Sequence, residues 1–164
     1  MKIPLSKIRI EKKGIYDFEK LQQVVKEWAD YRQFFYNEGT YSIANSGDGK
    51  EITWNFKLAR RLDNYFFLRI DVSVYTFRQI EVMVSVDGKK ITMDQGYVNM
   101  HFKPELELDY RGIFEGSKFK TFLQNFYHMY IIKDKINIVI VKLIIETHGL
   151  LHAIRRSLRM NLGL

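Results

Sequence analysis

The stretch "QGYVNMHFKPELELDYRG", residues 95–112, alternates between apolar and polar side chains almost without a break. One set suits a protein core: Val98, Met100, Phe102, Pro104, Leu106 and Leu108. Successive side chains of a β-strand point to opposite faces of the sheet, so the stretch predicts a long strand with one face on the core. The alternation leaves open whether the other face meets water, a ligand or a partner.

Similar alternation upstream predicts more of the same sheet. Residues 51–75 predict two strands joined at residues 62–64, and residues 80–86 lead into Asp87-Gly88, a pair typical of hairpin turns. Short strands are expected at residues 8–10, ended by Gly14, and at residues 36–43, followed by a glycine-rich hairpin loop. Together these segments predict an antiparallel sheet of four to six strands with one open face.

Apolar residues recur at helical spacing in three segments. Residues 17–31 are the clearest, with Asp17 in the N-cap position, and Ser117 is a suitable N-cap for a second helix. Residues 133–160 predict a long terminal helix, although the β-branched run 136–145 leaves open a strand followed by a helix.

The fold predicted from these elements is α+β, with a single domain over residues 1–164. Its sheet is expected to be packed on one face by the N-terminal helix and the C-terminal helices, the last one long. A hydrophobic content of 46% and an aromatic content of 15% indicate a folded chain rather than a disordered one.

The composition excludes several kinds of chemistry. The chain has no cysteine, which removes disulfides, thiol catalysis and cysteine-ligated zinc. Its first residues contain no apolar segment of signal-peptide length, and no uninterrupted apolar run reaches about 18 residues. We therefore expect a cytoplasmic protein without a transmembrane segment.

The net charge of +7 is concentrated in the last third of the chain. Residues 1–50 carry nine basic and seven acidic side chains, and residues 51–110 carry eight and nine. Residues 111–164 carry nine and three, a net charge of +6. Such asymmetry indicates a polyanionic or acidic partner, although general solubility gives the same signal.

No catalytic or metal-binding motif stands out. His148 and His152 lie one helical turn apart, but no third ligand accompanies them and the segment is basic. Glu105, Glu107 and Asp109 share one face of a strand, which is more typical of a solvated edge than of a catalytic pair. We predict no catalytic residue, no metal and no cofactor, and the sequence leans away from an enzyme.

Basic and aromatic side chains share the outward parity of the predicted sheet. A sheet that stacks bases and holds phosphates needs this combination, unless helices cover the face. The predicted nucleic-acid contacts there are Lys57, Arg61, Arg69, His101 and Lys103.

The end of the chain is a basic amphipathic segment. Arg155, Arg156 and Arg159 are predicted to contact phosphates, and they lie opposite Ile154, Leu158 and Leu162. The same pattern suits an acidic protein groove, an anionic membrane, or an ordinary helix whose apolar side docks on the core.

The run "DGKKITMDQGYVNMHFKPELELDYRGIFEGSKFKTFLQNFYHMYIIKDKI", residues 87–136, resembles a group of small, uncharacterised archaeal proteins. The shared features are a glycine-lysine hairpin, a strand ending in an acidic "DY-x-G" segment, an aromatic helix followed by "YII", and a long terminal helix. The resemblance covers the C-terminal half and implies a shared shape but no activity. The last helix is apolar and basic here, whereas an acidic, lysine-rich helix is usual in that group.

The leading functional prediction is a non-enzymatic basic protein that associates with RNA or a ribonucleoprotein through its C-terminal helix. The outward sheet face would form a second patch. The alternatives are a small-molecule or lipid carrier with a cavity between helix and sheet, and a peripheral membrane protein.

Overall fold

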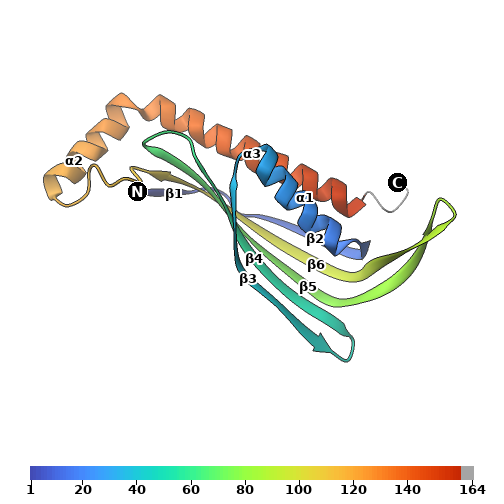
Figure 1. Ribbon diagram of the computed structural model, residues 1–164. Helices are drawn as coiled ribbons and strands as arrows, with labels where there is room; N and C mark the ends of the chain where they lie inside the picture. Colours follow the sequence, from blue (N-terminus) through green and yellow to red (C-terminus); the bar gives the residue numbers. More distant parts are fainter. Residues whose placement is uncertain (160–164) are drawn as a thin grey trace.

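The computed structural model describes residues 1–159, which form an antiparallel sheet and three α-helices (Figure 1). The strands are β1 (Lys2–Pro4), β2 (Ile8–Tyr16), β3 (Phe35–Ser46), β4 (Gly49–Arg61), β5 (Phe66–Val86) and β6 (Lys89–Leu108). The helices are α1 (Phe18–Tyr31), α2 (Lys118–Phe126) and α3 (Lys133–Arg159), and a π-helical turn, η1 (Tyr127–Ile131), follows α2. The predicted α+β fold is confirmed.

The sheet is ordered β1-β6-β5-β4-β3, and β2 pairs with β6 beyond β1. The opening stretch therefore lies inside the sheet, with β5 on one side and β1 and β2 on the other. Its predicted core residues are buried, and Phe102 pairs with Val72 of β5 and Ile8 of β2. The strand does not form an edge.

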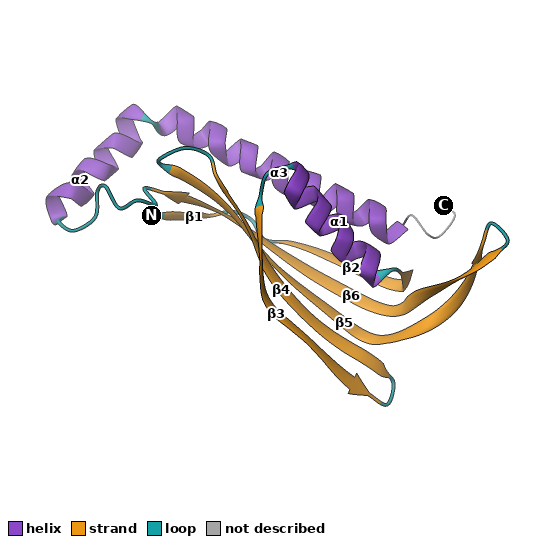
Figure 2. Cartoon of the chain, in the orientation of Figure 1, coloured by secondary structure: helices purple, strands orange, loops and turns teal. Residues whose placement is uncertain are grey.

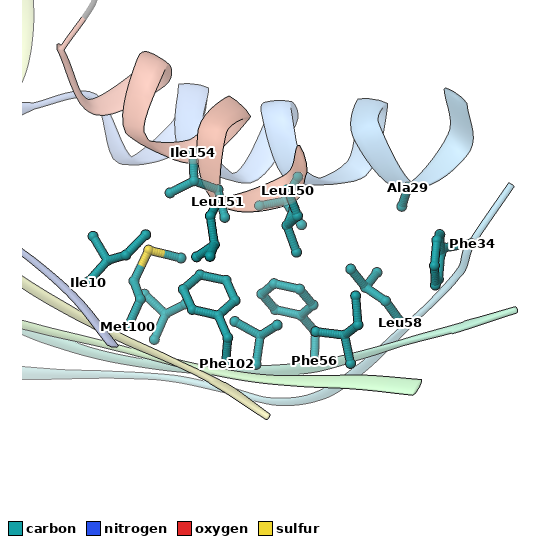
Figure 3. Packing of buried hydrophobic residues seen from close by; sticks show 14 of the residues in the cluster. Ile10, Ala29, Phe34, Phe56, Leu58, Met100, Phe102, Leu150, Leu151 and Ile154 are labelled. Carbon is teal, nitrogen blue, oxygen red and sulfur yellow. The ribbon is translucent and has the colours of Figure 1, made fainter. Parts of the chain in front are cut away.

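Helices α1 and α3 lie side by side on one face of the sheet (Figure 2). Leu150, Leu151 and Ile154 of α3 point down onto Phe56 and Phe102 of the strands (Figure 3). The opposite face carries no helix over most of its area (Figure 2), so the interpretation in which helices cover the outward aromatic side chains is wrong for most of the described sheet. Tyr65, just before β5, packs against Tyr127 of η1.

The helix starts agree with the predicted caps. The side chain of Asp17 accepts a hydrogen bond from the Lys20 backbone N–H at 3.0 Å, and the Ser117 hydroxyl accepts one from the Lys120 N–H at 3.1 Å. Helix α3 is continuous from Lys133 to Arg159, so the β-branched run 136–145 is helical. The predicted end at residue 160 lies outside the described residues.

Strand β2 is longer than predicted, because Gly14 does not end it. Gly14 pairs with Gly96 of β6 and has a φ of 129°, a conformation that glycine adopts without strain. The predicted loop after residue 43 is also shorter, since β3 continues to Ser46 and only residues 47 and 48 form the turn.

A buried carboxylate ties the helical layer to the edge of the sheet. Glu146 of α3 is 3% exposed and accepts a hydrogen bond from Arg32 Nε at 2.9 Å, with Arg60 Nη1 of β4 at 3.4 Å. Burial alone would raise the pKa of Glu146, but the hydrogen bond and charge of Arg32 and the charge of Arg60 hold it below its ordinary value.

Glu146→Gln keeps the size of the side chain and removes its charge. We expect the free energy of unfolding at neutral pH to fall by about 1–3 kcal/mol, because charge-assisted hydrogen bonds are removed from a buried place. A carboxyl with a lowered pKa stabilises the fold above its unfolded pKa, and this contribution disappears as the pH falls through the folded pKa. Urea unfolding should therefore show the variant approaching the wild type in acid.

The exposed Glu51 provides the control, since Glu51→Gln should leave the free energy of unfolding nearly unchanged. A deficit in Glu146→Gln that is equally large at neutral and acidic pH would contradict the assigned ion pair.

Candidate binding surface on the open face of the sheet

The predicted basic residues of the sheet all lie on the face opposite the helices. Lys57 and Lys103 are exposed, and Asp71 pairs with both of them across β4, β5 and β6. Their two positive charges therefore flank a negative one. His101 is half-buried beside Tyr75, with 6.3 Å between the ring centroids.

Acidic side chains compensate another part of the open face. Arg69 Nη2 lies 2.6 Å from Glu107 Oε2, and Lys2 Nζ lies 3.8 Å from Glu105 Oε1. Glu105 and Glu107 therefore act as ion-pair partners rather than as a free acidic row. The predicted contact Arg69 is in the same place as expected, but its charge is already paired.

Aromatic rings hold the arginines at this end of the sheet. The Arg61 guanidinium lies 5.7 Å from the Tyr110 ring centroid, and that of Arg69 lies 4.9 Å from the Phe67 centroid. The rings of Phe67 and Tyr110 lie in contact at a tilt of 53°, with 5.4 Å between their centroids. The outward Phe67 is thus explained by cation–π contacts on the open face.

The other acidic and histidine side chains that the sequence offered for catalysis or metal binding have a structural role or lie away from the open face. Asp109 is buried at a φ of 52° and accepts hydrogen bonds from the backbone N–H groups of Ile113 and Phe114, so it closes a turn. His148 and His152 are exposed on α3. Within the described part of the chain, no cluster of three or more His, Cys, Asp or Glu side chains could hold a metal ion.

The arginines of the C-terminal segment are separated from the sheet patch. Arg155 and Arg156 are exposed on α3, which covers the other face, while Ile154 and Leu158 are buried in the core. Arg159 is the last residue of α3, and its side chain lies outside the described part. The two predicted patches therefore do not form one surface.

A β-bulge creates the most distinctive feature of the open face. The pairing of β5 with β6 shifts between Phe77 and Ile80, and Arg78 in the bulge has a φ of 51°. Gln79 turns inward as a result, where it accepts a hydrogen bond from the Tyr16 hydroxyl at 2.9 Å. From Val82 and Met93 onward β5 and β6 pair only with each other, and this ribbon curls toward the helical side (Figure 1).

Glycines on both neighbouring strands allow the bulge to fit. A Cβ atom at Gly96 of β6 would lie 2.8 Å from the Phe77 carbonyl oxygen. A Cβ atom at Gly49 of β4 would lie 2.9 Å from the Arg78 carbonyl carbon. Both distances are shorter than van der Waals contact, so the bend in the sheet depends on these two glycines.

The bend forms a shallow groove of about 580 Å³ on the open face. It is lined by Lys13, Gly14, Phe77, Arg78, Ile80, Gln95, Gly96 and Tyr97. The rings of Phe77 and Tyr97 lie 6.0 Å apart, and none of these eight lining residues is acidic. Two cations and two aromatic rings thus converge on one concave surface.

None of the four groove residues that carry this chemistry was among the contacts predicted from the sequence. Tyr97 belongs to the predicted outward parity, but Lys13, Phe77 and Arg78 were not predicted. The alternation of β5 breaks at "YTFRQI", residues 75–80, where Phe77, Arg78 and Gln79 follow one another without an apolar-polar rhythm. This interruption of the alternation, together with Gly96 on the neighbouring strand, is the sequence signal that could have predicted the bulge.

Side chains fill the central part of the interior between α3 and the sheet. Trp54, Phe102, Leu150 and Leu151 are fully buried and belong to one continuous hydrophobic cluster. Side chains of both layers meet in this space (Figure 3). A pocket of about 420 Å³ remains toward β1, between Ile144 and His148 of α3 and Pro104 of β6, so the alternative of a ligand carrier stays a prediction.

Fold and surface together define an α+β protein with one helix-covered and one open sheet face. No family model matches the chain, and a search of curated proteins finds no match. The resemblance of residues 87–136 to small archaeal proteins therefore stays a prediction.

Gly96→Ala should lower the free energy of unfolding by about 1–3 kcal/mol, because the added methyl group meets the backbone of β5. Gly149→Ala in α3 is the matched control, since the new Cβ would lie an ordinary 3.7 Å from Trp28 Nε1. A helical Gly→Ala change is expected to stabilise by up to about 1 kcal/mol. Urea unfolding measures both, and a neutral Gly96→Ala would refute the tight approach at the bulge.

Proposed function

We propose that this chain is a non-enzymatic protein that binds single-stranded RNA on the open face of its sheet. The observation that supports this proposal best is the groove at the bulge, where Phe77 and Tyr97 lie between Lys13 and Arg78. Aromatic rings stack on unpaired bases, and the cations attract the phosphates that connect them.

The aromatic rings in the groove favour a single-stranded nucleic acid over a duplex. A base must leave its own stack to lie on a protein ring, and this costs least in a strand without pairing partners. Tyr75 and His101 continue the aromatic surface, and Arg9 pairs with His101 across β2 and β6. These residues supply a path for the nucleotide next to the groove.

Charge pairing limits the binding path to one part of the face. Arg9 forms an ion pair with Glu11 and donates a hydrogen bond to Asn99, and Arg69 is paired with Glu107. The two cations of the groove have no acidic neighbour among its lining residues. In this proposal the groove is the main contact, and Lys57, Lys103 and Arg61 are secondary ones.

The proposal changes the role expected for the C-terminal segment. Arg155 and Arg156 lie on the helical layer, on the other side of the sheet from the groove. They contact RNA in this proposal only as a separate site. An RNA partner and the absence of cysteine are both consistent with a cytoplasmic protein.

Fluorescence anisotropy of a labelled mixed-sequence RNA, titrated over a range of salt concentrations, tests the proposal. Base–aromatic stacking contributes roughly 1–3 kcal/mol per base, so Phe77→Ala with Tyr97→Ala should weaken binding at least roughly tenfold. Lys13→Gln with Arg78→Gln should also reduce the salt slope by about 0.7 for each phosphate that the protein no longer neutralises. Circular dichroism and thermal unfolding establish that each variant is folded.

The control pair is Arg155→Gln with Arg156→Gln, which removes the same amount of charge from the opposite side of the molecule. We expect this pair to bind nearly as well as the wild type. RNA binding that disappears in the control but persists in the groove variants would place the site on α3. No binding by the wild type at low salt would overturn the proposal.

A further inference from the structure

Helix α2 and the turn η1 carry an apolar side that is largely exposed in the described structure. Phe119, Phe122, Phe126 and Tyr130 follow one another at helical spacing, and they are 68%, 63%, 48% and 70% exposed. No side chain of α2 is buried. The helix projects beyond the sheet at the end where β1 lies (Figure 1).

The turn after α2 fixes which side of the helix faces outward. Tyr127 packs edge-on against Tyr65 with ring centroids 5.7 Å apart, and it also lies 5.7 Å from Phe114. His128 forms a hydrogen bond with the Tyr65 hydroxyl. These contacts hold one side of η1 on the body, while Met129, Tyr130 and Ile131 stay exposed. The orientation of the apolar side is therefore built into the fold.

The first half of α3 also carries exposed apolar side chains. Ile138, Val141 and Ile145 lie on one stripe of the helix and are exposed, whereas Val139 and Leu143 pack into the core. Such a group of large apolar side chains is unusual on a soluble surface and typically marks an interaction site.

Lysines surround this apolar surface. Residues 117–145 contain five lysines and one aspartate, a net charge of +4. Lys135 forms an ion pair with Asp63 at 2.9 Å, while Lys118, Lys120, Lys133 and Lys142 are exposed. Most of the basic excess in the last third of the chain therefore lies here and not in the final arginines.

We propose that α2, η1 and the exposed stripe of α3 form a docking surface for an anionic lipid bilayer. Aromatic side chains suit the boundary between headgroups and acyl chains, and lysines around them suit anionic headgroups. α2 lies in the plane of the interface, with Phe119, Phe122 and Phe126 inserted. This inference does not rest on the proposed RNA binding.

The charge distribution favours a bilayer over a second copy of the chain. A two-fold symmetric interface brings the same surface of both copies together, so two sets of lysines with a net charge of +4 each would face one another. An anionic bilayer instead supplies an apolar interior and an opposite surface charge.

The bilayer contact is peripheral in this proposal. Residues Lys133–Leu158 are long and apolar enough to cross a membrane by length and composition. Leu143, Leu150 and Leu151, however, are fully buried against the sheet, and spanning would require them to leave the core. The sequence predicted a possible membrane contact at the C-terminal segment. Its apolar residues Ile154 and Leu158 are buried in the core and do not face outward.

Vesicle flotation of the full chain tests the proposal, with vesicles of phosphatidylcholine alone and of phosphatidylcholine containing roughly a quarter phosphatidylserine. The wild type should partition onto the anionic vesicles at least roughly tenfold better than onto the neutral ones. Phe122→Ser with Phe126→Ser should lower that partitioning at least roughly tenfold. Lys118→Gln with Lys120→Gln should remove most of the preference for anionic vesicles.

The matched control changes exposed apolar residues elsewhere. Ile43→Ser with Met83→Ser changes side chains of β3 and β5 that are 49% and 63% exposed, and it should leave flotation unchanged. The proposal is overturned if the wild type fails to float with anionic vesicles, or if flotation falls as far in the control as in the α2 variant. A dimer in sedimentation equilibrium that dissociates in the α2 variant, without vesicle binding, would assign the surface to a second copy.

Discussion

The contact of α3 with the sheet determines which surfaces of this protein are available. Leu143, Leu150, Leu151 and Ile154 are all fully buried, and each such side chain contributes roughly 1.5–3 kcal/mol when it leaves water. Since α1 lies beside α3 on the same face, this single layer satisfies the apolar side of the sheet. The other sheet face and the aromatic side of α2 have no partner within the described chain, and both candidate interaction surfaces are what this packing leaves exposed.

The open face has local chemistry that its overall composition does not reveal. Registers place Asp71 between Lys57 and Lys103, and Glu107 next to Arg69, so much of the basic charge is neutralised by neighbours. At the bulge, where the register is interrupted, Lys13 and Arg78 line one groove that has no carboxylate among its lining residues. Strand register, which sequence composition does not report, therefore decides where an anion is attracted.

Sequence patterns predicted the fold well and the site in part, for physical reasons. Alternation and capping are local, so the sequence correctly predicted a strand within residues 95–112, where β6 runs to Leu108, and the caps at Asp17 and Ser117. The helix over residues 136–145 was ambiguous, because tertiary packing of its buried side overrides the β-propensity of its isoleucines and valines. The groove was missed because it depends on Gly49 and Gly96, which are far apart in sequence and meet only across β5.

The two-stranded ribbon beyond the bulge is attached to the rest of the sheet at one end only. Residues 82–93 pair only within the β5–β6 hairpin, so no third strand supports the ribbon there. A ribbon of two strands is compliant on its own, and its stiffness at the root comes from the tight backbone packing around Arg78. Because the groove lies where this ribbon joins the sheet, a molecule bound there would restrict the bending motion of the hairpin tip.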